Sequence, residues 1–315
     1  MKLLKKLIKT LLIAIALIVV FIGLFFGHSA IPLDKLKAKY APSPSAFITM
    51  GGMNVHYRDE GPKTDTIPIV LIHGTSSSLH TFEGWTAKLK DSHRVLRMDL
   101  PGFGLTGPFP NRDYSIAHYV SFINQFLEVK NVKQCVLAGN SLGGNIAWRY
   151  AVKYPNKVNK LVLIDASGYP LKSKSVPMAF RLAKTPVLNK LLTFITPRFM
   201  AKSSVENVYV DKSKITPKLV DRYFELTLRK GNRQALIDRM RDLEVSDTLQ
   251  IKNITKPTLV LWGAKDLLIP INNALKFHRD LPNDTLVIIK NTGHVPMEEN
   301  PEESLVAFNS FLKKY

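Results

Sequence analysis

The run Ala138-Gly139-Asn140-Ser141-Leu142-Gly143-Gly144 constrains the fold of this chain more than any other feature. An apolar stretch at 134–138 precedes the run, and a helix-like stretch at 145–154 follows it. A serine held on a sharp strand-to-helix turn adopts a strained backbone, so its neighbours must be small. Gly139 and Gly143 meet that need, although a plain glycine-rich turn has the same spacing. The run therefore predicts a strand-turn-helix unit with Ser141 at its tip, and the rest of the chain decides its role.

Size and composition set the limits for the rest of the chain. At 315 residues and 45% hydrophobic content, it is long enough for one large α/β domain with an insertion, or for two domains. Its one cysteine, Cys135, excludes an intramolecular disulfide and a thiolate metal cluster. The formal charge is +19, yet the sequence has no zinc-finger spacing, basic heptad region or aromatic RNA-binding run, so we expect no nucleic-acid partner.

The N-terminal segment has the pattern of a membrane anchor. An uncharged run, Leu11–Gly27, follows Lys2, Lys5, Lys6 and Lys9. As a helix it would extend about 26 Å, close to the roughly 30 Å of a bilayer core. We interpret residues 1–30 as an uncleaved signal anchor with one transmembrane helix; the alternative is a cleaved signal peptide. The lysines predict a cytoplasmic N-terminus, with the remainder of the chain in the periplasm, the lumen or the exterior.

The remaining chain divides into a tether, a core and an insertion. Three prolines in residues 31–45 predict a stiff tether. Apolar strand-like runs then alternate with helical segments over 46–166 and again over 251–315, which predicts a mostly parallel, doubly wound α/β sheet. Between them, 167–250 lacks sheet-type strands and has helical periodicity, so we predict a helical cap. We expect basic residues of the cap, such as Lys172, Lys174 and Lys184, to meet anionic lipid, although a solvated surface has the same composition.

Two later loops supply partners for the serine. Asp266 follows an apolar strand, and His294 follows the last strand of the chain. A serine hydroxyl needs a histidine base, and the base needs an acid that fixes its tautomer. Because the loops that follow parallel strands meet at one sheet edge, we predict a triad of Ser141, Asp266 and His294. His73 is the rival base and Asp165 the rival acid.

Backbone N–H groups of Leu142 and Thr75 are the predicted oxyanion hole. A Gly102-x-Gly104-x-x-Gly107 pattern matches a dinucleotide fingerprint, but Pro108 and Pro110 prevent a helix from beginning there. The sequence also lacks the phosphate-loop and zinc-protease patterns. We therefore predict neither cofactor nor metal.

Together these motifs resemble the α/β-hydrolase superfamily over residues 46–315. The segments that carry the resemblance are HGT at 73–75, DLPGFG at 99–104, GNSLGG at 139–144, WGAKD at 262–266 and GHVP at 293–296. They are most similar to the serine esterase and lipase branch, including membrane-anchored bacterial lipases and monoacylglycerol lipases. The resemblance implies an α/β-hydrolase fold with a helical cap.

The expected activity is hydrolysis of carboxylic esters, with acylglycerols or other lipid esters as substrates and an acyl-enzyme intermediate. The GNS segment also resembles the C–C bond hydrolases of meta-cleavage pathways, so these remain an alternative, as do amidases and perhydrolases with the same triad. A non-catalytic, membrane-anchored binding protein is a remote alternative. The sequence does not determine the oligomeric state.

Overall fold

Short apolar strands build a central sheet that is covered on both faces. A computed structural model describes residues 2–241 and 247–315, so Met1 of the predicted anchor and residues 242–246 of the predicted cap lie outside the described residues. The strands are β1 (Ala46–Met50), β2 (Met53–Glu60), β3 (Ile69–Ile72), β4 (Val95–Met98), β5 (Cys135–Asn140), β6 (Val158–Ile164), β7 (Thr258–Gly263) and β8 (Asp284–Ile289). Their order is β1-β2-β4-β3-β5-β6-β7-β8. Every pair is parallel except β1 with β2 and β2 with β4, which confirms the mostly parallel sheet.

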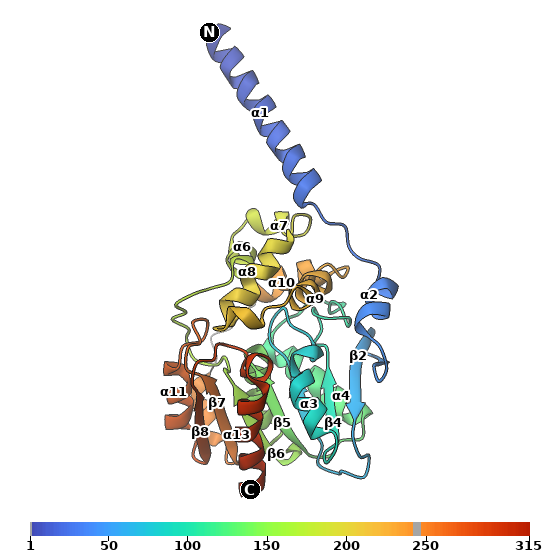
Figure 1. Ribbon diagram of the computed structural model, residues 1–315, viewed down its shortest axis with the longest axis vertical. Helices are drawn as coiled ribbons and strands as arrows, with labels where there is room; N and C mark the ends of the chain where they lie inside the picture. The colour runs from blue at the N-terminus through green and yellow to red at the C-terminus, as the bar shows by residue number, and fades with distance from the viewer. Residues whose placement is uncertain (1, 242–246) are drawn as a thin grey trace.

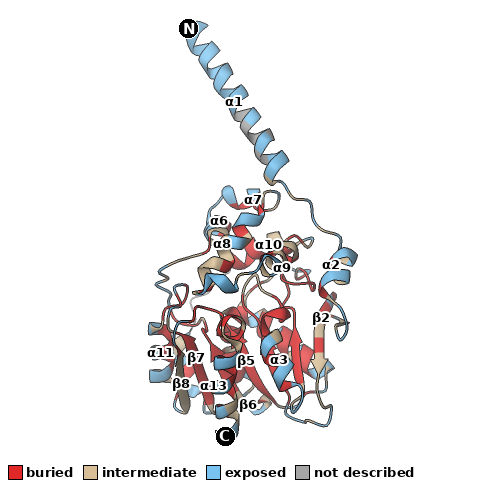
Figure 2. Ribbon diagram, viewed as in Figure 1, coloured by how far each residue is buried: buried red, intermediate tan, exposed pale blue. Residues whose placement is uncertain are grey.

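Helices flank the sheet and extend beyond it (Figure 1). Their bounds are α1 (Lys2–Phe26), α2 (Leu33–Tyr40), α3 (Glu83–Leu89), α4 (Ile116–Val129), α5 (Leu142–Lys153), α6 (Met178–Lys184), α7 (Leu188–Leu191), α8 (Arg198–Val208), α9 (Pro217–Thr227), α10 (Asn232–Arg241), α11 (Asn272–Asp280), α12 (Pro296–Glu299) and α13 (Pro301–Lys314). Alternate residues of the central strands pack on opposite faces. In β3, Val70 and Ile72 join the layer of α4, α5 and α11, whereas Ile69 and Leu71 join the layer of α3 and α13. This double burial explains the continuous apolar runs in the sequence, and Figure 2 shows the sheet as the buried centre.

Helices α6 to α10 lie between β6 and β7 in the chain and cover one end of the sheet (Figure 1). They have a small apolar cluster of their own, separate from the two sheet layers. Its buried members are Ala183, Leu192, Met200, Leu236, Ile237 and Met240. The polypeptide leaves β6 at the carboxyl end of the parallel strands and forms these helices before it returns to the amino end of β7, so they lie over the sheet edge where ligands bind.

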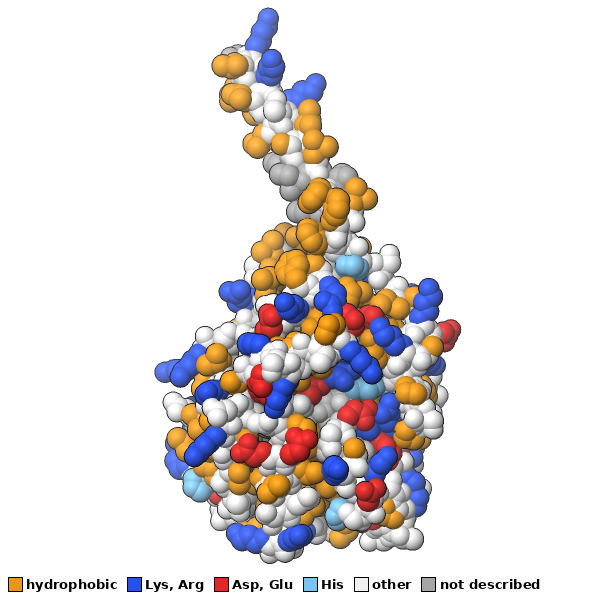
Figure 3. Space-filling view, viewed as in Figure 1, with side chains coloured by type: hydrophobic (Ala, Val, Ile, Leu, Met, Phe, Trp, Pro, Cys, Tyr) orange, Lys and Arg blue, Asp and Glu red, His pale blue; other side chains and the backbone are white. Residues whose placement is uncertain are grey.

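The transmembrane helix predicted for residues 1–30 is wrong. Helix α1 projects from the body, with hydrophobic side chains along it and lysines toward its tip (Figure 3). Among the described residues, no helix is both long enough and apolar enough to cross a membrane. The physical reason is that Lys2, Lys5, Lys6 and Lys9 belong to the same helix, and the apolar run that follows them and Thr10 covers only Leu11–Phe26. That part extends about 24 Å, short of the roughly 30 Å hydrocarbon core. The predicted single-pass topology, and the membrane localisation inferred from it, are therefore wrong as well.

The segment predicted as a tether, 31–45, contains helix α2, which packs on the body. Leu36 and Tyr40 are buried together with Leu105 and Leu226. Tyr40 Oη donates a hydrogen bond to Glu225 of α9 at 2.9 Å. These contacts fix the segment against the loop after β4 and against the helices above the sheet.

Candidate active site

Ser141 lies at the junction of β5 and α5 with a strained backbone. Its φ is +56° and its ψ is −114°, a conformation that L-residues rarely adopt. The two flanking glycines allow this turn because the chain is crowded around it. A Cβ on Gly139 would lie 2.1 Å from the carbonyl oxygen of Gly143, and one on Gly143 would lie 2.2 Å from that of Ile72. The structure therefore has the strand-turn-helix unit predicted from the sequence, with the N-terminus of α5 directly after the serine.

Asp266 and His294 are joined by a short hydrogen bond. The His294 Nδ1–H donates to Asp266 Oδ2 at 2.7 Å, and both side chains are almost completely buried. The other carboxylate oxygen, Oδ1, accepts hydrogen bonds from the backbone N–H groups of Leu268 at 2.8 Å and Ile269 at 2.9 Å. The acid is thus held at both oxygens, and it holds the imidazole with Nε2 free to act as a base.

Ser141 and His294 line the same cavity. Asn140, the residue before the serine, donates through Nδ2 to the carbonyl oxygen of His294 at 3.0 Å, which ties the histidine loop to the end of β5. Among the described residues, no hydrogen bond links Ser141 Oγ to the imidazole. Such contacts are commonly long in unliganded hydrolases and tighten when substrate binds.

The rival acid, Asp165, lies beside the pair rather than against the histidine. It follows β6, is fully buried and has a φ of +43°. Its Oδ1 accepts from the backbone N–H of Gly263 at 3.0 Å, and no described donor reaches its Oδ2. Burial, and secondly the neighbouring Asp266, raise the pKa of Asp165 well above its ordinary value. The raised pKa favours the protonated form of Asp165, which can donate its own proton to Asp266.

Asp165, Asp266 and His294 also offer ligand atoms within 4.8 Å of one another, an arrangement that could suggest a metal site. The 2.7 Å between His294 Nδ1 and Asp266 Oδ2 is a hydrogen-bond distance. Two ligands of a tetrahedral metal would be about 3.3 Å apart. The geometry therefore fits a proton between histidine and aspartate better than it fits a cation.

Replacing Asp165 with asparagine is expected to make thermal stability less dependent on pH. In the folded chain the pKa of Asp165 is raised, whereas in the unfolded chain the carboxyl ionises near pH 4. Wild-type stability therefore falls as the pH rises from the unfolded pKa to the folded one. An asparagine at this position accepts a hydrogen bond from Gly263 and donates one toward Asp266 without ionising. The melting temperature of the variant minus that of wild type should therefore increase between pH 5 and pH 8. A difference independent of pH in thermal melts would contradict this expectation.

The predicted oxyanion donors lie next to the serine. Thr75 lines the same cavity, and a Cβ on the preceding Gly74 would lie 3.1 Å from the Ser141 Cβ. Leu142 is the first residue of α5. The rival base, His73, is occupied elsewhere: its Nδ1–H donates to Gly74 O at 2.7 Å, and its Nε2 accepts from the N–H of Leu100 at 2.9 Å. Burial lowers the pKa of His73, so it is a neutral loop-fixing residue.

Asp99 organises the loops around the site, a role not predicted from the sequence. Its Oδ1 accepts from the N–H of Leu79, and its Oδ2 accepts from the N–H of Leu105 and from Nδ1 of His56. Burial acts to raise the pKa of Asp99, but His56 outweighs it and the pKa lies well below the ordinary value. Asp99 thus joins β2, the loop after β3 and its own loop.

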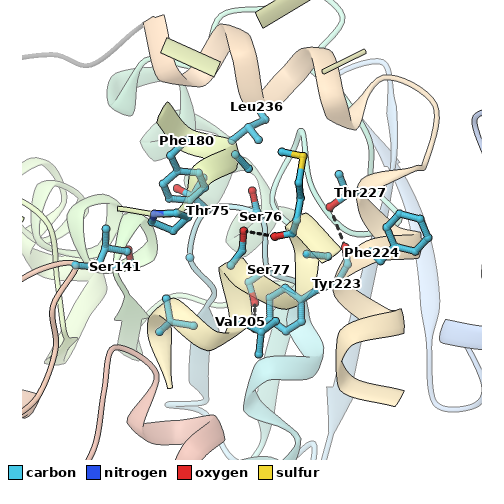
Figure 4. Close-up of a pocket in the computed structure, with 18 of the residues that line it drawn as sticks. Thr75, Ser76, Ser77, Ser141, Phe180, Val205, Tyr223, Phe224, Thr227 and Leu236 are labelled. Atoms are coloured by element: carbon cyan, nitrogen blue, oxygen red, sulfur yellow. Dashed lines mark hydrogen bonds between the residues drawn. The ribbon is translucent and has the colours of Figure 1, made fainter. Parts of the chain in front are cut away.

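The cavity beside Ser141 lies between the sheet and the helices above it (Figure 4). It contains about 980 Å³ of empty space, including the part open to solvent. Residues of the loop after β3 form one side, and residues of α6, α8, α9 and α10 form the other, among them Phe180, Val205, Phe224 and Leu236. Apolar side chains predominate, so the cavity suits a hydrocarbon chain.

Comparison with known proteins agrees with this architecture. The sequence profile of the alpha/beta hydrolase fold family matches residues 67–301. The uncharacterized hydrolase YugF of Bacillus subtilis is 32% identical, over 87% of this chain and 99% of its own. Lipase 3 of a Moraxella species is 29% identical, over 78% of both chains. The solved meta-cleavage product hydrolase of Pseudomonas fluorescens superimposes with a TM-score of 0.74 at 21% identity, over 85% of this chain and 97% of its own.

Fold and site together define a hydrolase built on a parallel α/β sheet. The profile match and the 32% identity show that the chain belongs to the α/β-hydrolase fold family, as its motifs indicated. The activities named for these relatives differ, so they establish the family and the hydrolase class but leave the substrate open.

Proposed function

We propose that the protein is a serine hydrolase that cleaves carboxylic esters, with acylglycerols or other lipid esters as its substrates. The observation that carries this proposal is the Asp266–His294 hydrogen bond at the edge of an apolar cavity that Ser141 also lines. A nucleophile, an oriented base and a hydrocarbon-sized space are what acyl transfer from a lipid ester requires. The similarity to Lipase 3 points the same way.

In the proposed mechanism, His294 Nε2 accepts the proton of Ser141 as Oγ attacks the ester carbonyl. The N–H groups of Leu142 and Thr75 stabilise the oxyanion, and the N-terminus of α5 adds positive potential. Collapse of the tetrahedral intermediate breaks the ester bond, and the alcohol leaves with the proton from His294. Water, deprotonated by the same ring, then attacks the acyl-enzyme, which releases the acid and restores Ser141.

We assign the acyl chain to the cavity beneath the cap proposed at 167–250. The test is hydrolysis of p-nitrophenyl esters with acyl chains of two to sixteen carbons by the full chain. We expect turnover that increases with acyl length until the cavity is full. Greater turnover of a 2-hydroxy-6-oxo-dienoate than of any ester would overturn the proposal in favour of C–C bond hydrolysis.

Filling the cavity should shorten the preferred acyl chain. Ala201 of α8 lines the cavity, so Ala201→Phe is expected to lower kcat/KM for a twelve-carbon ester by at least about 10-fold while the acetate ester changes little. Lys202→Phe is the matched control, because Lys202 is exposed on the same helix and does not line the cavity. Equal losses on both esters for Ala201→Phe would show that the cavity does not hold the acyl chain.

A further inference from the structure

One cationic side chain lines the otherwise uncharged cavity. Apart from His294, Arg233 is the only basic or acidic residue among the described residues that line it. The other lining groups are apolar or carry hydroxyl, amide or backbone polar atoms. Arg233 is the second residue of α10, and burial lowers the pKa of its guanidinium because part of the charge is removed from water.

Among the described residues, the guanidinium of Arg233 has a backbone partner but no carboxylate partner. Its Nη1 donates to the carbonyl oxygen of His28 at 2.8 Å. Within 2–241 and 247–315, no Asp or Glu forms an ion pair with it, in contrast to Arg112, which pairs with Asp238 at 2.7 Å, and Arg222, which pairs with Glu298. A half-buried charge without a counterion is costly, so a protein has reason to keep one where a ligand supplies the opposite charge.

Arg233 belongs to the end of the cavity away from the serine. His28, which accepts its hydrogen bond, packs edge-on against Phe224 with ring centroids 5.1 Å apart. In Figure 4, Phe224 and Ser141 lie on opposite sides of the cavity. A substrate with its ester at Ser141 therefore extends its far end toward the guanidinium.

We infer that Arg233 binds an anionic group, a carboxylate or a phosphate, that the substrate carries at the end remote from the scissile ester. This inference rests on the proposed ester hydrolysis and narrows it to anionic esters rather than neutral acylglycerols. No described residue accepts from the Nε–H and Nη2–H groups of Arg233, and the planar guanidinium matches two oxygens of an oxyanion. The formal charge of +19 on the chain also attracts anionic substrates over a longer range.

The anion could belong to the acyl chain or to the leaving group, and paired substrates distinguish these sources. The acyl pair is the p-nitrophenyl monoester of suberic acid and its methyl-capped, neutral analogue. The leaving-group pair is a 1-acylglycerol and the corresponding 1-acylglycerol 3-phosphate. We expect wild type to prefer the anionic member of one pair by about 10-fold or more in kcat/KM, chiefly through a lower KM.

Variants at Arg233 separate recognition from a structural role. Arg233→Gln should abolish the preference by lowering kcat/KM for the anionic member of the pair far more than for the neutral member, and Arg233→Lys should restore part of the preference. Lys230→Gln is the control, because it removes an exposed charge from the same region and should leave the preference within about 2-fold of wild type. Equal losses on both members of each pair would mean that Arg233 only fixes the chain at His28, and would overturn the inference.

Binding of suberate itself, measured by calorimetry, gives a readout that does not depend on turnover. Suberate that binds to wild type but not to Arg233→Gln supports the anion site. If the same wild-type protein hydrolyses no ester, only the proposed function fails. If wild type binds neither suberate nor glycerol 3-phosphate more tightly than Arg233→Gln does, the anion site is overturned whether or not neutral esters are hydrolysed.

Discussion

Ser141→Ala is expected to lower kcat for p-nitrophenyl esters by a factor on the order of 10⁶. Without Oγ no acyl-enzyme forms, and only the oxyanion donors and substrate binding remain to accelerate attack by water. The substitution leaves the turn intact, because alanine keeps the Cβ that serine already carries at its φ of +56°. Steady-state kinetics measure kcat. The amount of p-nitrophenol released before the steady state gives the concentration of active sites.

The control is Ser204→Ala. Ser204 also lines the cavity, but its Oγ donates to the carbonyl oxygen of Met200 within α8 at 2.8 Å. We expect a change of no more than about 3-fold for this variant, the scale of one lost neutral hydrogen bond. If Ser141→Ala kept more than a hundredth of wild-type kcat, another group would be the nucleophile and the proposed mechanism would be wrong.

The fold and the position of Ser141 could be predicted because their constraints are local. Contacts within the turn and with β3 require glycine at positions 139 and 143. This requirement can be recognised in the five consecutive residues 139–143. Asp266 and His294 could be paired because loops that follow parallel strands meet at one sheet edge. Each of these inferences uses only spacing and the direction of the strands.

The role of Asp99 could not be predicted in the same way. Its partners come from residues 56, 79 and 105, and no spacing rule brings these positions together before the sheet is formed. The role of Arg233 could not be predicted from the sequence either. The chain has 44 lysines and arginines, and only the cavity distinguishes this one from those on the surface.

At the N-terminus, the composition of the uncharged run alone indicates a separate membrane span. In the structure this run belongs to α1, which includes the lysines before it. In α2, Leu36 and Tyr40 lie four residues apart and bury one helical face, a signal that the neighbouring prolines concealed.

Asp266→Asn is expected to lower kcat by about 10⁴-fold. Because the N–H groups of Leu268 and Ile269 hold Oδ1, the asparagine must keep its oxygen there and turn its NH₂ group toward His294. The imidazole then has to accept at Nδ1 and carry its proton on Nε2, the tautomer that cannot take the proton of Ser141.

Asp165→Asn is the matched control for Asp266→Asn, because the same substitution falls on the neighbouring buried aspartate. The raised pKa of Asp165 favours its protonated form, and its Oδ1 contact with Gly263 survives the substitution. Among the described residues no hydrogen bond joins Asp165 to the histidine, so kcat should change by no more than about 10-fold. Steady-state kinetics from pH 5 to pH 9 compare the two variants. If Asp165→Asn lost activity and Asp266→Asn kept it, the acid that orients His294 during turnover would be Asp165, and the loop after β6 rather than the loop after β7 would supply the third member of the triad.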